Sequence, residues 1–277
     1  MKSGNRPAGL IPVGLAIILL VAACEDPVDQ GIQSVVLEGG AYVRITNSQD
    51  LTQPLDSTTL AALNNDVFSL EIWAAGDTLP PGVVELPTLF MIGNDQVGKL
   101  GVYRVPPDSS RIRVFFDNRL VGSFSIPGCD WNDSDRFTQV VVTYDLATVR
   151  VYGNGSFLGS MDDTVGIDIG DSDALIGADW NTPDDDGDLD QFWYGAIDEV
   201  RLWTRVLPAD EMEFRYRNPK NLTRYYSADG LDPLLGLWRF NIERQEGEEL
   251  LDFSGNGNHA VIHSGTGSFY FSTSGAE

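Results

Sequence analysis

Six short runs of alternating or β-branched side chains dominate the sequence between residues 41 and 152. They are AYVRIT (41–46), VFSLEIWAA (67–75), KLGVYRV (99–105), RIRVFF (111–116), FTQVVVTY (137–144) and TVRVY (148–152). A period of two is typical of β-strands, and turn residues separate these runs. Many short strands at such spacing favour a sandwich or jelly roll, so we predict an all-β fold.

Two local signals add to this pattern. Gly153, Asn154 and Gly155 predict a tight hairpin that leads into the strand SFLGSM. The segment PADEMEFRYR (208–217) predicts the one short helix, because Pro208 suits its first turn and acidic residues follow at its amino end.

The first 24 residues read as an export signal. Lys2 and Arg6 precede an apolar stretch, and the run Val21, Ala22, Ala23, Cys24 resembles a bacterial lipobox. We predict a lipoprotein signal peptide over residues 1–23, lipidation of Cys24 and a polar linker over residues 24–33. The alternative interpretation is an ordinary signal peptide that is cleaved near Ala23.

The residue after the predicted lipidated cysteine is Glu25, whereas an aspartate at this position resembles an inner-membrane retention signal. We therefore expect a membrane-anchored lipoprotein at the outer membrane or cell surface, in a leaflet that the sequence leaves open.

The acidic composition limits the classes of partner. The chain carries 41 acidic and 18 basic residues, a formal net charge of −23, which disfavours nucleic acid and can attract divalent cations. With Cys24 lipidated, Cys129 is left without a second cysteine for a disulfide. An ordinary hydrophobic core must then hold residues 34–277, and that length suits one large β domain.

Three segments carry a family resemblance: FTQVVVTYDLATVRVYGNGSFLGS (137–160), DALIG (173–177) and FWYGAIDEVRLWTRVLPADEM (192–212). They resemble the laminin G type domain of the concanavalin A-like lectin/glucanase superfamily, particularly its pentraxin-like branch. The resemblance covers most of residues 34–262, and implies a jelly roll of two antiparallel sheets with a calcium ion at its rim. Phe137 and Gln139 depart from it, since the family usually has tryptophan and often histidine there.

The tail, residues 234–262, resembles the segment that often opens such a domain, although here it comes last. About 40 residues are too few for a second sandwich, and a lone strand would leave an unsatisfied edge. We therefore expect this segment to complete the first sheet of a single domain.

Six carboxylates are candidate calcium ligands. Asp184, Asp186, Asp188 and Asp190 alternate in an acidic loop, but Gly195 stands where an EF-hand loop needs a glutamate. The alternative is a solvated loop that binds nothing tightly. Asp252, in the turn DFSGNGN, could meet Asp198 to complete the set.

Asp198 is the most constrained of the six. Alternation places it on the same strand face as Ala196, Val200 and Leu202, and a carboxylate that faces a core must be hydrogen-bonded, paired or bound to a cation. The alternative to calcium is a carboxylate that accepts backbone N–H groups. Glu199 and Arg201 alternate onto the other face, where we expect a surface ion pair of little energetic value.

The tryptophans divide into two groups. Trp73, Trp203 and Trp238 lie within strand patterns, which favours packing in the core. Trp131 and Trp180 lie in loops among Asn and Asp, where an exposed ring could stack on a sugar, and Trp180 is the better candidate. The alternative is that these loop side chains fold back over an edge of the sandwich.

Catalysis finds little support. The two histidines, His259 and His263, both lie in the tail, and neither a G-x-S-x-G motif nor the E-x-D-x-x-E motif of the superfamily's glucanases occurs. We predict a non-catalytic envelope lipoprotein that binds an extracellular glycan, with structural calcium. The alternative is a structural or adhesive module that binds an envelope protein, and a degenerate glycoside hydrolase is the third possibility.

Overall fold

The computed structural model describes residues 33–47, 50–54, 63–64, 66–93, 98–169, 174–180, 189–219 and 234–276. Residues 1–23 and Cys24 lie outside these ranges, so the predictions of a signal peptide and a lipid anchor stay predictions. In the part of the chain that is described, no helix has the length and apolar character of a membrane span.

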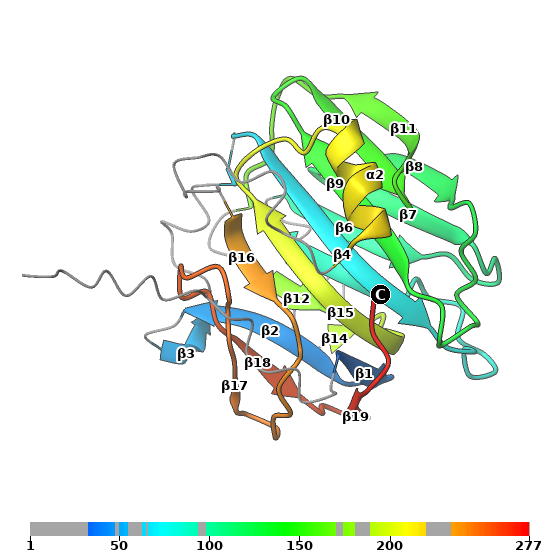
Figure 1. Ribbon diagram of the computed structural model, residues 1–277, viewed down its shortest axis with the longest axis vertical. Helices are drawn as coiled ribbons and strands as arrows, with labels where there is room; N and C mark the ends of the chain where they lie inside the picture. The colour runs from blue at the N-terminus through cyan, green and yellow to red at the C-terminus, as the bar shows by residue number, and fades with distance from the viewer. Residues whose placement is uncertain are drawn as a thin grey trace, which may run out of the picture.

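Two antiparallel sheets form the molecule (Figure 1). Sheet A contains, in spatial order, β11 (Ser156–Asp162), β10 (Thr148–Gly153), β9 (Thr138–Tyr144), β4 (Phe68–Gly76), β15 (Tyr194–Trp203), β1 (Ser34–Glu38) and β19 (Ser268–Ser272), with β16 (Leu234–Trp238) also paired to β15. The first and last strands are therefore neighbours, which brings both ends of the described fold to one sheet.

Sheet B contains β17 (Glu249–Leu250), β18 (Ala260–His263), β2 (Tyr42–Asn47), β12 (Ala174–Ile176), β5 (Thr88–Gly93), β6 (Lys99–Arg104), β7 (Arg111–Phe116) and β8 (Arg119–Ser125) in spatial order, with β3 (Asp50–Pro54) paired to β2. A two-stranded hairpin, β13 (Asp179–Trp180) and β14 (Leu189–Asp190), completes the set. The predicted all-β sandwich is confirmed.

The core lies between the sheets. Alternate residues of sheet A, such as Ile72, Val142 and Val151, belong to the same buried cluster as Val102 and Val114 of sheet B. This is the expected result of a period of two, because every second side chain of each strand points to the opposite sheet. The hairpin between β10 and β11 forms as predicted, with Asn154 and Gly155 at φ 49° and 72°.

The outer face of sheet A carries the one helix of the described residues, α2 (Ala209–Arg217), which Figure 1 shows in front of the sheet. The guanidinium groups of Arg205 and Arg215 lie over Trp203, at 4.9 and 4.4 Å from the centroid of its ring. Tyr216 stacks on Trp73 with ring centroids 5.9 Å apart. The tryptophans predicted to be core residues are all buried, and two of them fix the helix to the sheet.

Strand β15 changes its partner halfway along. One edge pairs with β4, and the other pairs with β1 through Ile197 and then with β16 from Val200 onward. Between these two residues the register with β4 shifts, so Asp198 and Glu199 form a β-bulge. The bulge breaks the strict alternation that the sequence predicts, because Ile197 joins the inter-sheet core together with Val200 and Leu202.

The prediction for the tail was wrong in one respect. Residues 234–262 do not complete a single sheet: β16 pairs with β15 in sheet A, whereas β17 and β18 extend sheet B beyond β2. The turn between them lets one short segment cross from one sheet to the other. Both sheets therefore gain strands from the tail.

Candidate functional site

The β13–β14 hairpin projects the predicted sugar-binding tryptophan. Asp179 is opposite Asp190 and Trp180 is opposite Leu189 in its register. Trp180 is partly exposed, unlike most of the large aromatic residues. The short hairpin leaves this ring at the surface while its neighbour Asp179 is buried.

Asp179 fixes the hairpin to the outer face of sheet B. Lys99 and Tyr103 of β6 alternate with core residues, so they point outward, and both donate to Asp179 Oδ2, at 3.0 and 2.6 Å. The other oxygen of Asp179 accepts the backbone N–H of Trp180 at 2.8 Å. Because this ion pair is buried and fully hydrogen-bonded, it holds the backbone of Trp180 in one position on sheet B.

Asp190 lies across the hairpin with a different environment. Partial burial raises its pKa above the usual range, and the negative charge of Asp179 raises the pKa further. In the described structure, Oδ1 of Asp190 is buried and has no hydrogen-bond partner. This oxygen is therefore available to a cation, as its prediction as a calcium ligand requires.

Asp198 lies in the bulge of β15 and is 2% exposed. Oδ2 accepts the backbone N–H of Ala276 at 2.8 Å, while Oδ1 has no partner within the described ranges. Burial raises the pKa of Asp198 well above its usual range, and the charge of Glu199 adds to the effect. The side-chain oxygen of Gln33, which is also buried and unpartnered, flanks the same Gly275 as Asp198.

Asp252, also a predicted calcium ligand, has a carboxylate that is hydrogen-bonded within the protein. Its carboxylate accepts hydrogen bonds from the backbone N–H groups of Leu237, Ser254 and Asn258 at 2.8–3.0 Å and from the Ser254 hydroxyl. Its own backbone N–H donates to Nδ1 of His259. Both oxygens therefore organise the turn that joins β16 to the tail strands.

The predicted calcium ligands that the structure describes do not form one cluster. Asp184, Asp186 and Asp188 lie outside the described residues. Among the residues that are described, no three acidic, histidine or cysteine side chains are gathered in a position to hold a metal ion. Asp190 lies on the hairpin and Asp198 lies in the bulge of β15. Calcium binding stays a prediction for each of them.

Trp131 is not a surface platform, contrary to its prediction as a sugar contact. It is fully buried in the core and meets Trp193 edge to face, with ring centroids 5.5 Å apart. Its backbone N–H donates to the carbonyl of Ser109. The loop folds back because burying an indole ring removes a large apolar area from water.

Glu199 and Arg201 do not form a surface pair. Both are buried, and Arg201 bonds Glu71 at 3.1 Å as well as Glu199 at 2.9 Å. Gln139 also donates to Glu71, and Arg239 of the tail contacts Glu199. Glu71 is the residue from which the sequence could have indicated this cluster. It is an acid within an otherwise apolar strand, and a buried carboxylate needs a cation or hydrogen-bond donors beside it.

Sequence reasoning also passed over the outer face of β6, β7 and β8. Ile112, Val114 and Phe116 of β7 point into the core, so the alternate residues Arg111, Arg113 and Phe115 point outward. Across the strands, Arg113 is in register with Tyr103 on one side and Ser123 on the other. Tyr103, which anchors the hairpin, thus also borders this face.

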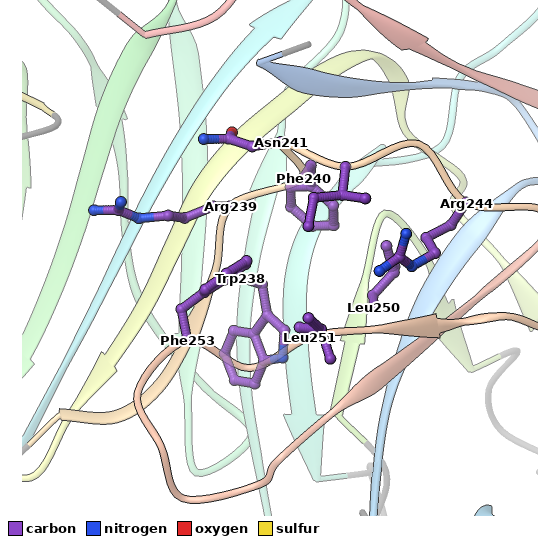
Figure 2. A pocket seen from close by; sticks show the side chains of 9 residues that line it. Trp238, Arg239, Phe240, Asn241, Arg244, Leu250, Leu251 and Phe253 are labelled. Carbon is purple, nitrogen blue, oxygen red and sulfur yellow. The ribbon is translucent and has the colours of Figure 1, made fainter. Parts of the chain in front are cut away.

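The pocket beside β16 and the tail is too small for a sugar. It lies against Trp238, Phe240, Leu250 and Phe253, and its volume of about 10 Å³ holds roughly one water molecule. Figure 2 shows the side chain of Arg239 directed away from the other residues that line this pocket. We assign no ligand to it.

Comparisons with known proteins agree with this architecture. A candidate carbohydrate-binding protein from Bacteroides ovatus ATCC 8483 superposes with a TM-score of 0.55 and 15% identity, over 87% of this chain and 60% of its own. The present chain therefore spans less than two thirds of that protein.

A heptameric SAP-like pentraxin from Limulus polyphemus gives a TM-score of 0.50 and 15% identity, over 85% and 96% of the two chains. Domains LG4-5 of the mouse laminin α1 chain superpose with a TM-score of 0.42 and 10% identity, over 64% of this chain and 44% of that chain. The superpositions of the Bacteroides protein and the pentraxin show a shared fold and, at 15% identity, nothing more.

No curated protein sequence matches the chain. A family model matches residues 38–213, more than half of the chain, and its family is described as the concanavalin A-like lectin/glucanases superfamily. With the two-sheet sandwich and its structural neighbours, this match shows that the chain belongs to the concanavalin A-like lectin/glucanases superfamily.

Proposed function

We propose that the protein binds carbohydrate without catalysis, on the outer face of sheet B beside the β13–β14 hairpin. The observation that carries this proposal is Trp180, a partly exposed indole ring whose backbone is fixed through Asp179 to Lys99 and Tyr103. An aromatic ring on a rigid base suits a sugar, because the apolar face of a pyranose stacks on it with little loss of conformational entropy. The shared fold of the Bacteroides protein supports the same class of ligand.

Calcium is part of this proposal. Asp190 and Asp198 fit a hard cation, since each has a buried carboxylate oxygen without a hydrogen-bond partner in the described structure. Asp252 does not fit, because both of its oxygens already accept hydrogen bonds. A bound calcium ion would neutralise the buried charge.

A lipid on Cys24 is the proposed membrane attachment, with the outer membrane or cell surface as the location. The short polar segment after Cys24 would separate the sandwich from the bilayer. This part of the proposal rests on the lipobox resemblance and is independent of the binding face.

The test is a glycan array probed with the full chain in calcium and again in EDTA, alongside Trp180→Ala and Phe157→Ala. Phe157 is the matched control, because its ring is 58% exposed but lies on β11 of sheet A. We expect wild type and Phe157→Ala to bind the same glycans and Trp180→Ala to lose them. Loss of binding in EDTA would support the calcium ion.

Calcium binding has its own readout in thermal unfolding. A rise in Tm with calcium that Asp190→Asn abolishes places the ion at the hairpin, whereas a rise that Asp198→Asn abolishes places it at the bulge. An unchanged Tm in all three proteins rules out a stabilising ion. If no glycan binds in either buffer, carbohydrate recognition is wrong and a protein partner becomes the better hypothesis.

A further inference from the structure

Arg113 differs from every other arginine of the described residues. The other twelve each have a hydrogen bond, an ion pair or a further electrostatic contact, such as Arg111 with Asp108 at 2.9 Å and Arg150 with Asp145. Within the same ranges, Arg113 has none, and its Nε is buried without an acceptor. In a chain with 41 acidic residues against 18 basic ones, the lack of a carboxylate partner requires an explanation.

An unpaired guanidinium in this position is energetically unfavourable. The group is partly removed from water on the outer face of β7, and a buried N–H without an acceptor costs more than a hydrogen bond returns. The planar guanidinium presents parallel N–H donors that match the two oxygens of a carboxylate. A ligand carboxylate would therefore satisfy the donors that the protein leaves unpaired.

The neighbours of Arg113 suit a saccharide. Ser123 and Ser125 of the edge strand β8 are exposed and offer hydroxyl groups, while Phe115 and the half-exposed Leu120 supply apolar surface. Phe115 meets Tyr103 edge to face at 5.7 Å, which fixes its ring. A sugar has hydroxyl groups on one side and C–H groups on the other. It can therefore bind where polar groups lie beside a fixed aromatic ring.

Two described carboxylates near this face are already paired within the protein. Asp179, which accepts the Tyr103 hydroxyl, is paired with Lys99, and Asp108 is paired with Arg111. Neither carboxylate is therefore placed to compete for Arg113. The positive charge of Arg113 remains for a ligand that comes from solution.

We infer that the outer face of β7 and β8 is a subsite for the carboxylate of an acidic saccharide, bound by Arg113 with Ser123 and Phe115 beside it. This inference rests on the proposed carbohydrate-binding function and narrows it to glycans that carry a uronic or a sialic acid. The Trp180 hairpin and the Arg113 subsite border the same residue, Tyr103, so one oligosaccharide can contact both.

The test is isothermal titration of the full chain with two matched pairs of saccharides. One pair is trigalacturonate and its methyl ester, and the other is a sialylated lactose and lactose itself. We expect the acidic member of one pair to bind at least about tenfold more tightly than its neutral counterpart, the effect of one charge-assisted pair. The pair that shows the difference identifies the source of the carboxylate.

Variants then assign the preference to Arg113. Arg113→Gln is expected to remove the difference in affinity between the acidic and the neutral saccharide. Arg113→Lys should retain part of it, because lysine keeps the positive charge but not the parallel N–H donors of the guanidinium group. The matched control, Arg150→Gln, removes the same charge from the outer face of sheet A and should keep the full preference. Circular dichroism of each variant checks that it folds.

Two outcomes contradict the inference separately from the proposed function. If wild type binds acidic and neutral members equally, or if Arg113→Gln keeps the preference, the carboxylate subsite is wrong while carbohydrate binding stands. If the chain binds no saccharide of either pair and none on the glycan array, both are wrong. The wild-type comparison decides the question even if Arg113→Gln does not fold.

Discussion

The backbone N–H of Ala276 donates a 2.8 Å hydrogen bond to Oδ2 of Asp198, and so ties the end of the described chain to a bulge 78 residues earlier. The bulge lies where β15 exchanges β1 for β16, and there the usual ladder partners are missing. Side-chain groups take their place: Asp198 is hydrogen-bonded to the C-terminal segment, and Glu199 forms an ion pair with Arg239. The two acids thus join segments that are distant in the sequence.

Asp198→Ala and Asp198→Asn should differ in stability. Alanine removes the acceptor and leaves the Ala276 N–H buried and unpaired, which costs about 1–3 kcal/mol of unfolding free energy. Asparagine keeps an acceptor oxygen without the buried charge, so we expect a free energy equal to or above that of wild type. Urea unfolding at pH 7 in EDTA measures the free energy of each variant. An asparagine variant as unstable as the alanine variant would contradict the role of Asp198 as the acceptor for the Ala276 N–H.

Glu71→Gln should be strongly destabilising at neutral pH. Burial alone would raise the pKa of Glu71, but Arg201, Arg215 and a hydrogen bond from Gln139 together hold it below its usual value of 4.5. Breaking a buried pair with Arg201 costs about 3–5 kcal/mol. The control Glu213→Gln, at an exposed pair with Arg217, should cost less than about 1 kcal/mol.

The pH dependence of the Glu71 effect has a defined sign. Because the pKa of the folded state is lowered, the unfolded chain binds more protons as the pH falls below about 4.5, and the contribution of Glu71 is lost there. The difference in unfolding free energy between wild type and Glu71→Gln should therefore shrink in acid. A difference that stays constant from pH 7 to pH 3 would show that Glu71 is not ionised in the fold.

The two loop tryptophans should respond oppositely to truncation. Trp131→Ala removes a fully buried ring and should cost about 3–5 kcal/mol of stability. Trp180→Ala should change the unfolding free energy by less than about 1 kcal/mol but abolish binding on the glycan array. Denaturant unfolding and the array together check this, and equal loss of stability in the two variants would place Trp180 in the core as well.

Cys129 should be slow to react while the protein is folded. Burial raises the pKa of its thiol from the usual value of 9.0 to about 11. At pH 8 the folded protein therefore contains about a hundredfold less thiolate than a thiol with the usual pKa would. Alkylation by iodoacetamide, followed by mass spectrometry, should be correspondingly slower in buffer than in urea. Similar rates in the two conditions would show that the thiol is exposed and ordinary.

Cys24→Ser should release the protein from membranes if the lipobox is used. Without a thiol the lipid cannot be attached, and the polar sandwich surface has little affinity of its own for a bilayer. Fractionation of cells that express wild type or Cys24→Ser, with detection by antibody, measures the release. Membrane retention of Cys24→Ser would favour the ordinary signal peptide.

The strands that form the middle of the sandwich could be predicted from sequence because their periodicity is local. The run RIRVFF becomes β7 residue for residue, and TVRVY differs from β10 only by Gly153. The helix was equally accessible, since Pro208 and the following acids mark its start at Ala209. Each of these signals lies within about ten residues of chain.

Long-range pairing was not accessible in the same way. The burial of Glu199 and Arg201 depends on Glu71, which is 130 residues from Arg201, and on a bulge that alternation cannot show. The burial of Trp131 depends on Trp193. A loop tryptophan reads the same in sequence whether its ring faces water or folds inward, because the contact that decides it comes from another part of the chain.

The sequence by itself therefore determined the strand periodicity, the all-β class and the family to which the chain belongs. The tertiary structure decided which polar groups are satisfied. It gave Asp252 a full set of donors, gave Asp179 two partners on β6, and left Arg113 without a partner among the residues that are described. The physical reason is that strand propensity is a property of neighbouring residues, whereas the pairing of a charge depends on side chains that only folding brings within hydrogen-bonding distance.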